Sequence, residues 1–300
     1  MALALAAQGQ GYVEPNPMVG CVLVKSDRVV ATGWHRKFGS DHAEIDALRE
    51  AGADARGATM YVTLEPCCHH GKTPPCSDAV IAAGVHRVVV ADCDPFAMVD
   101  GRGIKQLKEA GIEVVVGILQ NEAARLNAPF HMLVTDKRPW VIAKWAMTLD
   151  GKIATRTLNS QWVSSAASRR LVHQLRGRVD AILIGRATAV VDDPQLTARP
   201  AGPRQAIRIV ADSLAGLPLQ SQLVQSAREI PVLVFTGPEA SVENCRQLTA
   251  AGCEVFGVHA DNPKDRLNQM LEELGRRQIT NLLVEGGGEI LGSLFDGNWI

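Results

Sequence analysis

The chain has 300 residues, of which 46% are hydrophobic and 21% charged, and 31 Lys and Arg side chains balance 32 Asp and Glu for a net charge of −1. This length favours two domains, and the neutral charge excludes the basic surface of a nucleic-acid-binding protein. No run reaches the roughly 18 apolar residues of a membrane span. The odd number of cysteines, seven, and the lack of a basic signal-peptide start favour a reducing cytoplasm.

The first half of the chain alternates strand and helix patterns in the manner of a layered α/β domain. Strands are predicted at 18–25, 28–33, 59–64, 85–91 and 112–116, and helices at 1–7, 41–51, 77–83, 104–110 and 121–127. The β-branched run 85–91 is typical of a strand covered on both faces. We expect this domain to span residues 1–135, ending before the polar segment 135–139.

The second half, residues 139–300, predicts another α/β domain with a largely parallel, covered sheet. Strands are predicted at 140–145, 181–184, 206–210, 232–235, 254–258 and 281–284, and helices at 166–175, 242–250, 265–276 and 289–295. No G-x-G-x-x-G follows the first of these strands, so the usual dinucleotide fingerprint is absent. The turn Gly286–Gly288 could present backbone N–H groups to a phosphate, but glycines between a strand and a helix are equally common for packing reasons.

Three residues have the types and order of zinc ligands: His42, Cys67 and Cys76. A catalytic zinc site uses three protein ligands and leaves a fourth position open, and Glu44 beside the histidine can move protons without binding metal. The pattern H-x-E followed by P-C and a later Cys is typical of zinc deaminases that act on amino-substituted nitrogen rings. The alternative is a buried histidine with two ordinary core cysteines, which explains neither Glu44 nor Pro66.

Longer motifs carry a resemblance to a known family. The chain resembles the bifunctional riboflavin-biosynthesis deaminase/reductases at 15–21 (PNPMVGC), 42–44 (HAE), 62–67 (VTLEPC), 71–76 (GKTPPC), 144–152 (KWAMTLDGK), 160–163 (SQWV), 180–185 (DAILIG), 192–196 (DDPQL) and 285–288 (EGGG). These motifs cover nearly the whole chain in the family's order. The resemblance implies a cytidine-deaminase-like three-layer domain followed by a dihydrofolate-reductase-like domain.

The resemblance also implies two consecutive reactions on a phosphoribosylated pyrimidine. Zinc, one ion per chain, would serve hydrolytic deamination of 2,5-diamino-6-(5-phosphoribosylamino)pyrimidin-4(3H)-one, with Glu44 as the general base and acid. NADPH would then reduce 5-amino-6-(5-phosphoribosylamino)uracil to the ribitylamino product, with Lys144 polarising the reacting oxygen. The expected partners are this small molecule and a second copy of the chain, met through the reductase domain, but neither nucleic acid nor membrane.

The family's binding residues carry over to compatible positions in this chain. The implied deaminase substrate contacts are Asn16, Ala43, His69 and Lys72. The implied NADPH contacts are Ala146, Trp162, Thr188, Asp192, Gly287, Gly288 and Ser293. The implied reductase substrate contacts are Ser160, Arg176, Leu196, Arg199 and Glu285. Without the resemblance, Asn16 is equally explained as a turn residue between prolines, and Lys72, Arg176 and Arg199 as surface charges. His35 and the other isolated histidines are expected to be packed or surface residues, and Cys68 is not expected to bind zinc.

Two other classes of function stay open at this stage. One is a nucleic-acid or free-nucleoside deaminase with a non-catalytic C-terminal domain; the other is a zinc-stabilised binding protein without chemistry, against which Glu44 argues. The segment 94–99 (DPFAMV), which begins Asp94-Pro95-Phe96, replaces the asparagine-proline pair that the family often has after that aspartate, so a loop near the deaminase substrate is expected to differ. Because family members usually continue beyond the position of Ile300, we expect a shortened reductase domain with an uncovered sheet edge.

Overall fold

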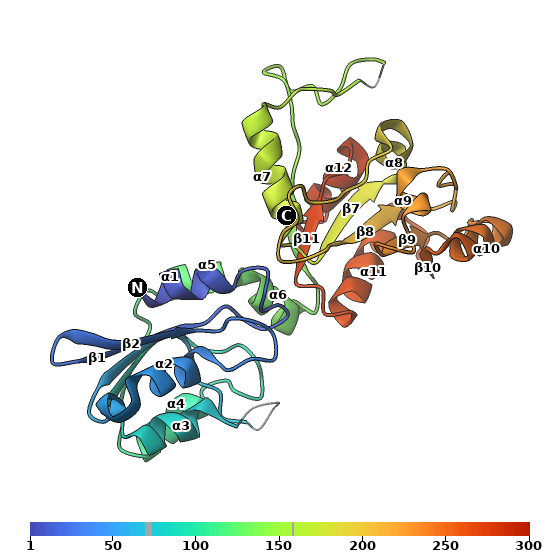
Figure 1. The fold of residues 1–300 in the computed structure, drawn as a ribbon. Helices are drawn as coiled ribbons and strands as arrows, with labels where there is room; N and C mark the ends of the chain where they lie inside the picture. The colour runs from blue at the N-terminus through green and yellow to red at the C-terminus, as the bar shows by residue number, and fades with distance from the viewer. Residues whose placement is uncertain (70–73, 158) are drawn as a thin grey trace. The chain divides into compact units, whose positions relative to one another are not determined.

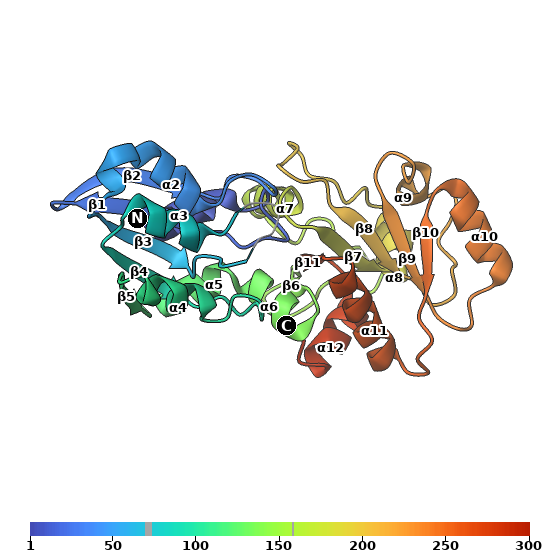
Figure 2. The ribbon, with the colours of Figure 1, turned by 90° about the horizontal axis from the view of Figure 1, so that it is seen from below.

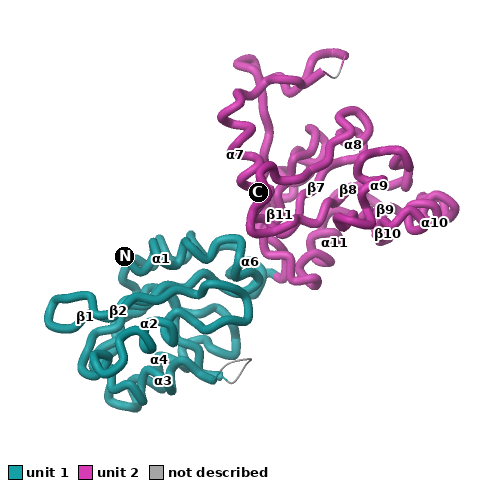
Figure 3. The backbone as a smooth tube through the Cα atoms, in the orientation of Figure 1, with its two compact units in different colours: residues 1–136 teal, residues 137–300 magenta. Residues whose placement is uncertain are grey.

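A computed structural model describes residues 1–69, 74–157 and 159–300. The chain divides into two compact units, 1–136 and 137–300, which Figure 3 colours separately. Each unit has its own sheet and its own hydrophobic core. Among the described residues, no helix has both the length and the apolar character needed to cross a membrane.

Unit 1 is a five-stranded sheet of order β2-β1-β3-β4-β5 between two layers of helices (Figure 1). The strands are β1 (Gly20–Lys25), β2 (Arg28–Trp34), β3 (Thr59–Leu64), β4 (Arg87–Asp92) and β5 (Glu113–Val116). The helices are α1 (Ala2–Ala6), α2 (Ala43–Ala51), α3 (Cys76–Ala83), α4 (Arg102–Glu109), α5 (Gln120–Leu126) and α6 (Ala128–Asp136). Strand β1 runs antiparallel to β2 and β3, whereas β3, β4 and β5 are parallel. This arrangement confirms the predicted three-layer α/β domain.

The helices cover both faces of the sheet in unit 1. Helices α2, α3 and α4 lie on one face and α1 and α5 on the other (Figure 1). Along β4, Val88 and Val90 join the core cluster that also holds Val80 of α3 and Leu107 of α4, while Val89 between them is buried too. Because successive side chains of a strand point to opposite faces, burial of all three confirms a strand covered on both sides.

Two glycines let backbone segments approach closely near the predicted zinc ligands. A Cβ at Gly33 of β2 would lie 2.3 Å from the Ala43 carbonyl oxygen, so its absence allows the start of α2 to rest on the strand. A Cβ at Gly103 of α4 would lie 2.1 Å from the Pro66 carbonyl oxygen. Both contacts fix segments that carry zinc-type ligands, because His42 precedes Ala43 and Cys67 follows Pro66.

Unit 2 is a six-stranded sheet of order β10-β9-β8-β7-β11-β6 in which every neighbouring pair is parallel. The strands are β6 (Trp140–Ala143), β7 (Ala181–Gly185), β8 (Ile207–Ala211), β9 (Val232–Thr236), β10 (Glu254–Gly257) and β11 (Asn281–Val284). The helices are α7 (Ala166–Arg176), α8 (Arg186–Asp192), α9 (Gln222–Gln225), α10 (Val242–Ala251), α11 (Pro263–Arg276) and α12 (Gly288–Asp296). The predicted parallel sheet is confirmed.

Two hydrophobic clusters hold helices against the two faces of this sheet. Ile182 and Ile184 of β7 belong to the cluster that includes residues of α9 and α10, whereas Ala181 and Leu183 belong to the cluster with α11 and α12. Figure 2 shows α11 and α12 together on one side of the strands. Full burial of each isoleucine or leucine side chain stabilises the fold by about 1.5–3 kcal/mol, so these contacts hold the helices on the sheet.

Three helices of the structure are absent from the sequence prediction. Helices α8 and α9 have only seven and four residues, too few for the helical period to stand out. Helix α6 begins at Ala128-Pro129, and proline is tolerated in a first helical turn because its missing N–H has no partner there. The strand predicted at 140–145 ends at Ala143, so Trp145 lies outside the sheet.

Candidate active sites of the two units

Helix starts and a strand end position the zinc-type residues of unit 1. His42 is the N-cap of α2, with extended backbone angles, and Glu44 lies in the first turn of that helix. Cys67 lies shortly after the end of β3, and Cys76 is the first residue of α3. The sequence prediction for these elements is therefore confirmed. All four residues lie at the edge of the sheet where strands end and helices begin.

The three ligand atoms converge. The imidazole Nδ1 of His42 lies 3.3 Å from the Cys76 Sγ and 3.6 Å from the Cys67 Sγ, and all three atoms lie within 4.8 Å of one another. In the part of the chain that the structure describes, this is the one group of at least three His, Cys, Asp or Glu side chains suited to a metal ion. Two thiolates and one imidazole are soft and borderline donors that suit Zn²⁺, and three protein ligands leave a position open for water.

Burial and the thiol pair shift the ionisation of this group. Its contact with the Cys76 thiol lowers the pKa of Cys67 to about 4, and the same contact with Cys67, together with burial, raises the pKa of Cys76 far above its ordinary value. Glu44 is buried, and desolvation raises its pKa to about 7, although nearby His42 opposes this shift. A carboxyl group with a pKa near neutrality can both accept and release a proton under ordinary conditions.

The half-buried Asn16 and the buried His35 form a pair beside the zinc-type group. The Asn16 amide Nδ2 lies 3.3 Å from His35 Nε2, and His35 Nδ1 lies 3.0 Å from the Asp41 carbonyl oxygen. The His35 ring also meets the His42 ring edge-on at 5.4 Å. Burial lowers the pKa of His35, which favours a neutral ring that donates to Asp41 and accepts from Asn16. The sequence left His35 as an isolated histidine, and only the fold reveals these neighbours.

Ala43 and His69 also lie near the predicted ligands. Ala43 is fully buried in the first turn of α2. His69 follows Cys67 by two residues, and its ring packs at a tilt 6.0 Å from the Phe96 ring, in the segment where the chain departs from the family's pattern. Cys68 does not join the metal group, because its thiol points to the Met98 carbonyl oxygen. Lys72, the fourth predicted contact, lies outside the described residues.

Glu65 ties the segment after β4 to the segment that carries Cys67. Its buried carboxylate accepts backbone N–H groups of Asp94 (3.4 Å), Gly101 (3.0 Å) and Ile104 (3.1 Å). These bonds compensate for the cost of burying a charge two residues before Cys67. The sequence analysis did not single out Glu65, although a carboxylate in an otherwise apolar strand end is a signal for such a role.

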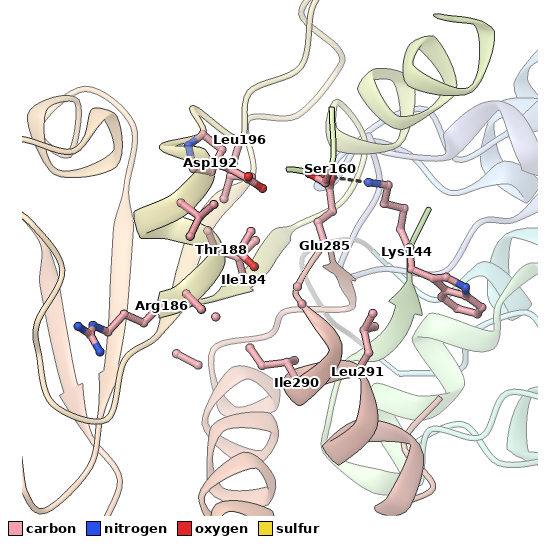
Figure 4. A pocket seen from close by; sticks show the side chains of 18 of the residues that line it. Lys144, Ser160, Ile184, Arg186, Thr188, Asp192, Leu196, Glu285, Ile290 and Leu291 are labelled. Carbon is pink, nitrogen blue, oxygen red and sulfur yellow. Dashed lines mark ion pairs between the residues drawn. The ribbon is translucent and has the colours of Figure 1, made fainter. Parts of the chain in front are cut away.

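In unit 2, the predicted residues line one cavity of about 1550 Å³. The cavity wall includes Lys144, Ala146, Ser160, Trp162, Arg176, Thr188, Asp192, Leu196, Arg199, Glu285, Gly287, Gly288 and Ser293. Figure 4 shows several of these side chains facing a common space from the ends of β6, β7 and β11. A cavity of this size exceeds the usual range of about 300–1,000 Å³ for one ligand, and so has room for a dinucleotide and a second molecule.

An ion-pair network lies at one end of this cavity. Glu285, with 5% of its side chain exposed, accepts two hydrogen bonds from Arg176, at 2.6 Å from Nε and 2.9 Å from Nη2. Lys144 Nζ lies 3.7 Å from Glu285, and Figure 4 marks this pair. Burial raises the pKa of Asp192, and the nearby Lys144 charge partly opposes this shift. The two-donor edge of Arg176 is therefore occupied by Glu285, whereas Arg199 is exposed and bonds to Gln195 Oε1 through Nη1.

The glycine turn and the segment after β6 form other parts of the cavity wall. Gly287 is the N-cap of α12, so the free backbone N–H groups of the first helical turn face this region. A Cβ at Gly287 would lie 3.5 Å from Thr188 Oγ1, which brings the turn against α8. Trp162 is 68% exposed and stacks under the Arg169 guanidinium at 4.4 Å. An apolar platform and helix-end donors are suited to a nicotinamide dinucleotide.

Together, the fold and the two sites define a class of enzyme, a zinc deaminase joined to a reductase. Residues 1–92 match the family model described as the cytidine and deoxycytidylate deaminase zinc-binding region, and residues 139–300 match the model of the RibD C-terminal domain. The chain belongs to the RibD family of bifunctional deaminase/reductases of riboflavin biosynthesis. Unit 1 is accordingly a zinc-binding deaminase domain and unit 2 an NADPH-dependent reductase domain.

Similar proteins cover nearly all of the chain. It is 44% identical over 289 residues to the riboflavin biosynthesis protein RibD of Actinobacillus pleuropneumoniae, a match that spans 96% of this chain and 77% of that protein. Form 1 of Acinetobacter baumannii RibD has a TM-score of 0.87 at 37% identity, covering 100% of this chain and 82% of that one. The Thermotoga maritima diaminohydroxyphosphoribosylaminopyrimidine deaminase/5-amino-6-(5-phosphoribosylamino)uracil reductase has a TM-score of 0.85 at 38% identity, covering 98% and 81%.

Proposed function

We propose that this chain deaminates 2,5-diamino-6-(5-phosphoribosylamino)pyrimidin-4(3H)-one in unit 1 and reduces 5-amino-6-(5-phosphoribosylamino)uracil in unit 2. The observation that carries the proposal is the convergence of His42, Cys67 and Cys76 beside a buried Glu44, in a chain whose second unit matches the RibD reductase model. The substrate of the Thermotoga maritima relative and the room for two molecules in the unit 2 cavity support the same assignment.

Glu44 carries the proton transfers of the deamination. The His42, Cys67 and Cys76 side chains would hold zinc, which supplies a Lewis acid that makes water acidic near neutral pH. The Glu44 carboxylate takes a proton from the attacking water and passes it to the ring nitrogen. Glu44 then moves the second proton of the attacking water to the amine, which leaves as ammonia, so that the amino group is replaced by oxygen. A pKa of about 7 suits both halves of this exchange.

Residues around the ligands orient the pyrimidine. Asn16 presents an amide that can donate to and accept from a ring edge, and the Asp41 carbonyl and His35 fix its orientation in turn. His69, packed on Phe96, offers a ring nitrogen to the substrate, and the backbone of Ala43 borders the ring. Lys72 is assigned to the phosphate on the chemistry of its ammonium group alone.

Lys144 and Glu285 serve the reduction. NADPH would supply the hydride to C1′ of the ribosyl group, and Lys144 Nζ donates the proton that the ribose ring oxygen needs as its bond to C1′ breaks, which leaves C1′ joined to the amine nitrogen as in the ribitylamino product. Glu285 holds Lys144 at 3.7 Å and fixes Arg176 through two hydrogen bonds. The substrate end of the cavity also includes Arg199, Ser160 and Leu196. The cofactor end includes Ala146, Trp162, Thr188, Asp192, Gly287, Gly288 and Ser293.

We further propose a cytoplasmic homo-oligomer assembled through the reductase unit. Seven cysteines without a disulfide, all free among the described residues, agree with a reducing compartment. The helix α7 buries none of its residues, and Leu171 on it is 61% exposed. An apolar side chain on such an uncovered helix suits contact with a second copy.

Incubation of the purified protein with the diaminopyrimidine ribotide, with and without NADPH, followed by mass spectrometry, tests both activities and their order. Without NADPH we expect replacement of one NH by one oxygen. With NADPH we expect a further gain of two hydrogens in the same product. Reduction before deamination, or release of ammonia from cytidine but not from the ribotide, contradicts the proposal and favours a nucleoside deaminase.

A further inference from the structure

The unit 2 cavity continues beyond the residues assigned to substrate and nicotinamide. Figure 4 places Lys144 and Glu285 at one end and Arg186 at the other, with Ile184 and Thr188 between them. Arg186 is the first residue of α8, directly after β7, and its side chain points away from Glu285. Ser213, Leu214 and Thr236, from the ends of β8 and β9, line the same end of the cavity.

At this end of the cavity, Arg186 is a positively charged side chain that has few polar contacts within the protein. Its guanidinium Nε lies 3.8 Å from Asp212 Oδ1, and within the described residues no hydrogen bond of its side chain is found. The side chain is 51% exposed, whereas that of Asp212 is 1% exposed. Arg266, the other arginine nearby, is 15% exposed and bonds to Glu239 (2.7 Å) and to the Ala260 carbonyl oxygen (2.8 Å). Arg186 is therefore the cation with donors to spare.

The buried acid behind Arg186 holds it in place. Asp212 follows β8, and burial raises its pKa while the Arg186 guanidinium lowers it. A Cβ at Gly216 would lie 3.2 Å from Arg186 Nε, so the guanidinium rests on the backbone of this turn. Both residues line the cavity, but the Arg186 side chain is 51% exposed and that of Asp212 only 1%, so the guanidinium is the more accessible of the two charges.

In dinucleotide-binding folds, an acid at a strand end selects the free ribose 2′-hydroxyl of NAD, whereas an arginine accommodates the 2′-phosphate of NADP. We propose that Arg186 forms the subsite for the 2′-phosphate of NADPH and sets the preference of this chain for NADPH over NADH. The inference rests on the assignment of the cavity to NADPH. A guanidinium binds phosphate oxygens through two parallel N–H donors, and the glycine turn at α12 is left for the pyrophosphate.

Calorimetric titration of the full chain with adenosine 2′,5′-bisphosphate and with 5′-AMP tests the subsite without any turnover. The Arg186→Gln variant should bind the bisphosphate about tenfold to a hundredfold more weakly, since one charge-assisted pair is lost, and 5′-AMP unchanged. Arg186→Lys should fall between, because it keeps the charge and loses the paired donors. Arg246→Gln, on the exposed surface of α10, is the matched control and should behave as the parent protein.

Coenzyme kinetics give the second measurement. For Arg186→Gln, kcat/KM for NADPH should fall by the same factor as the affinity, with kcat/KM for NADH unchanged. The double variant Arg186→Gln/Asp212→Asn removes the unpaired buried acid and should show the same selectivity if the single variant folds poorly. If kcat/KM falls equally for NADPH and NADH, Arg186 contacts the pyrophosphate; if neither changes, Arg186 lies outside the site. Either result overturns the proposal. Failure of the parent protein to bind the bisphosphate contradicts the NADPH assignment itself.

Discussion

The two sites are built on opposite principles. The deaminase group brings three ligand atoms within 4.8 Å, next to a buried carboxyl group whose pKa is about 7. The reductase cavity spreads its residues over about 1550 Å³, and Trp162 in its wall is largely exposed. A metal ion demands few donors at fixed short distances, whereas a dinucleotide and a sugar phosphate demand a long surface with scattered contacts. Single substitutions should therefore be severe in unit 1 and graded in unit 2.

The sharpest test of the compact site separates metal binding from proton transfer. His42→Ala should lose zinc and deamination together, because the ligand itself is gone. Glu44→Gln should retain zinc and lose about a hundredfold to ten-thousandfold in deamination, the usual contribution of a positioned acid–base group. Elemental analysis of the two purified variants, beside their rates of ammonia release, measures both quantities. Zinc missing from Glu44→Gln would move Glu44 into the metal shell.

Removal of zinc tests whether the two sites are independent. A chelator should abolish ammonia release and leave NADPH oxidation with the deaminated intermediate, since every residue assigned to the reduction lies at or beyond Lys144. Re-addition of zinc should restore the deaminase. Parallel loss of both activities while the circular dichroism spectrum stays native would show that the two units depend on each other.

In the reductase cavity, Glu285→Gln should have a graded effect. The substitution keeps the shape of the side chain but removes the charge that holds Arg176 and Lys144. Removing one partner of a nearly buried ion pair leaves the other charge uncompensated, at a cost of about 3–5 kcal/mol where burial is complete. We expect kcat/KM for reduction to fall at least tenfold, with ammonia release unaltered. An unchanged reductase rate would place Glu285 outside the working site.

The smallest expected effect is a pH dependence of stability in unit 1. Burial raises the pKa of Asp94 to about 6, above its value in the unfolded chain, so the folded state binds more protons. Stability from this group is therefore fully present below about pH 4 and is lost as the pH rises to about 6, by about 1–3 kcal/mol. Asp94→Asn, which keeps an acceptor for the Phe96 N–H (2.8 Å), should raise the thermal midpoint at pH 8 and not at pH 4. Scanning calorimetry of the zinc-loaded parent and variant at pH 8 and pH 4 measures these thermal midpoints.

The sequence alone determined the order of strands and helices, the parallel second sheet and the identity of the zinc-type residues. Apolar periodicity reports burial locally, and a metal site needs specific residue types that can be recognised one by one. The resemblance, which is itself read from the sequence, supplied the remaining site residues, among them Asn16 and Trp162. The short helices α8 and α9 were not predicted, because they are too short to show a helical period of apolar residues.

Only the tertiary structure decided which distant residues meet. His35 lies against Asn16 because the antiparallel pairing of β1 with β2 places Gly20 opposite Trp34, and Arg176 is bound by Glu285, a residue 109 positions away. Glu65 collects three N–H groups from a segment about 30–40 residues further on. Arg186 faces the cavity because Asp212 is buried behind it. Contacts of this kind depend on chain topology and on the burial of charge, and no local pattern of residues encodes them.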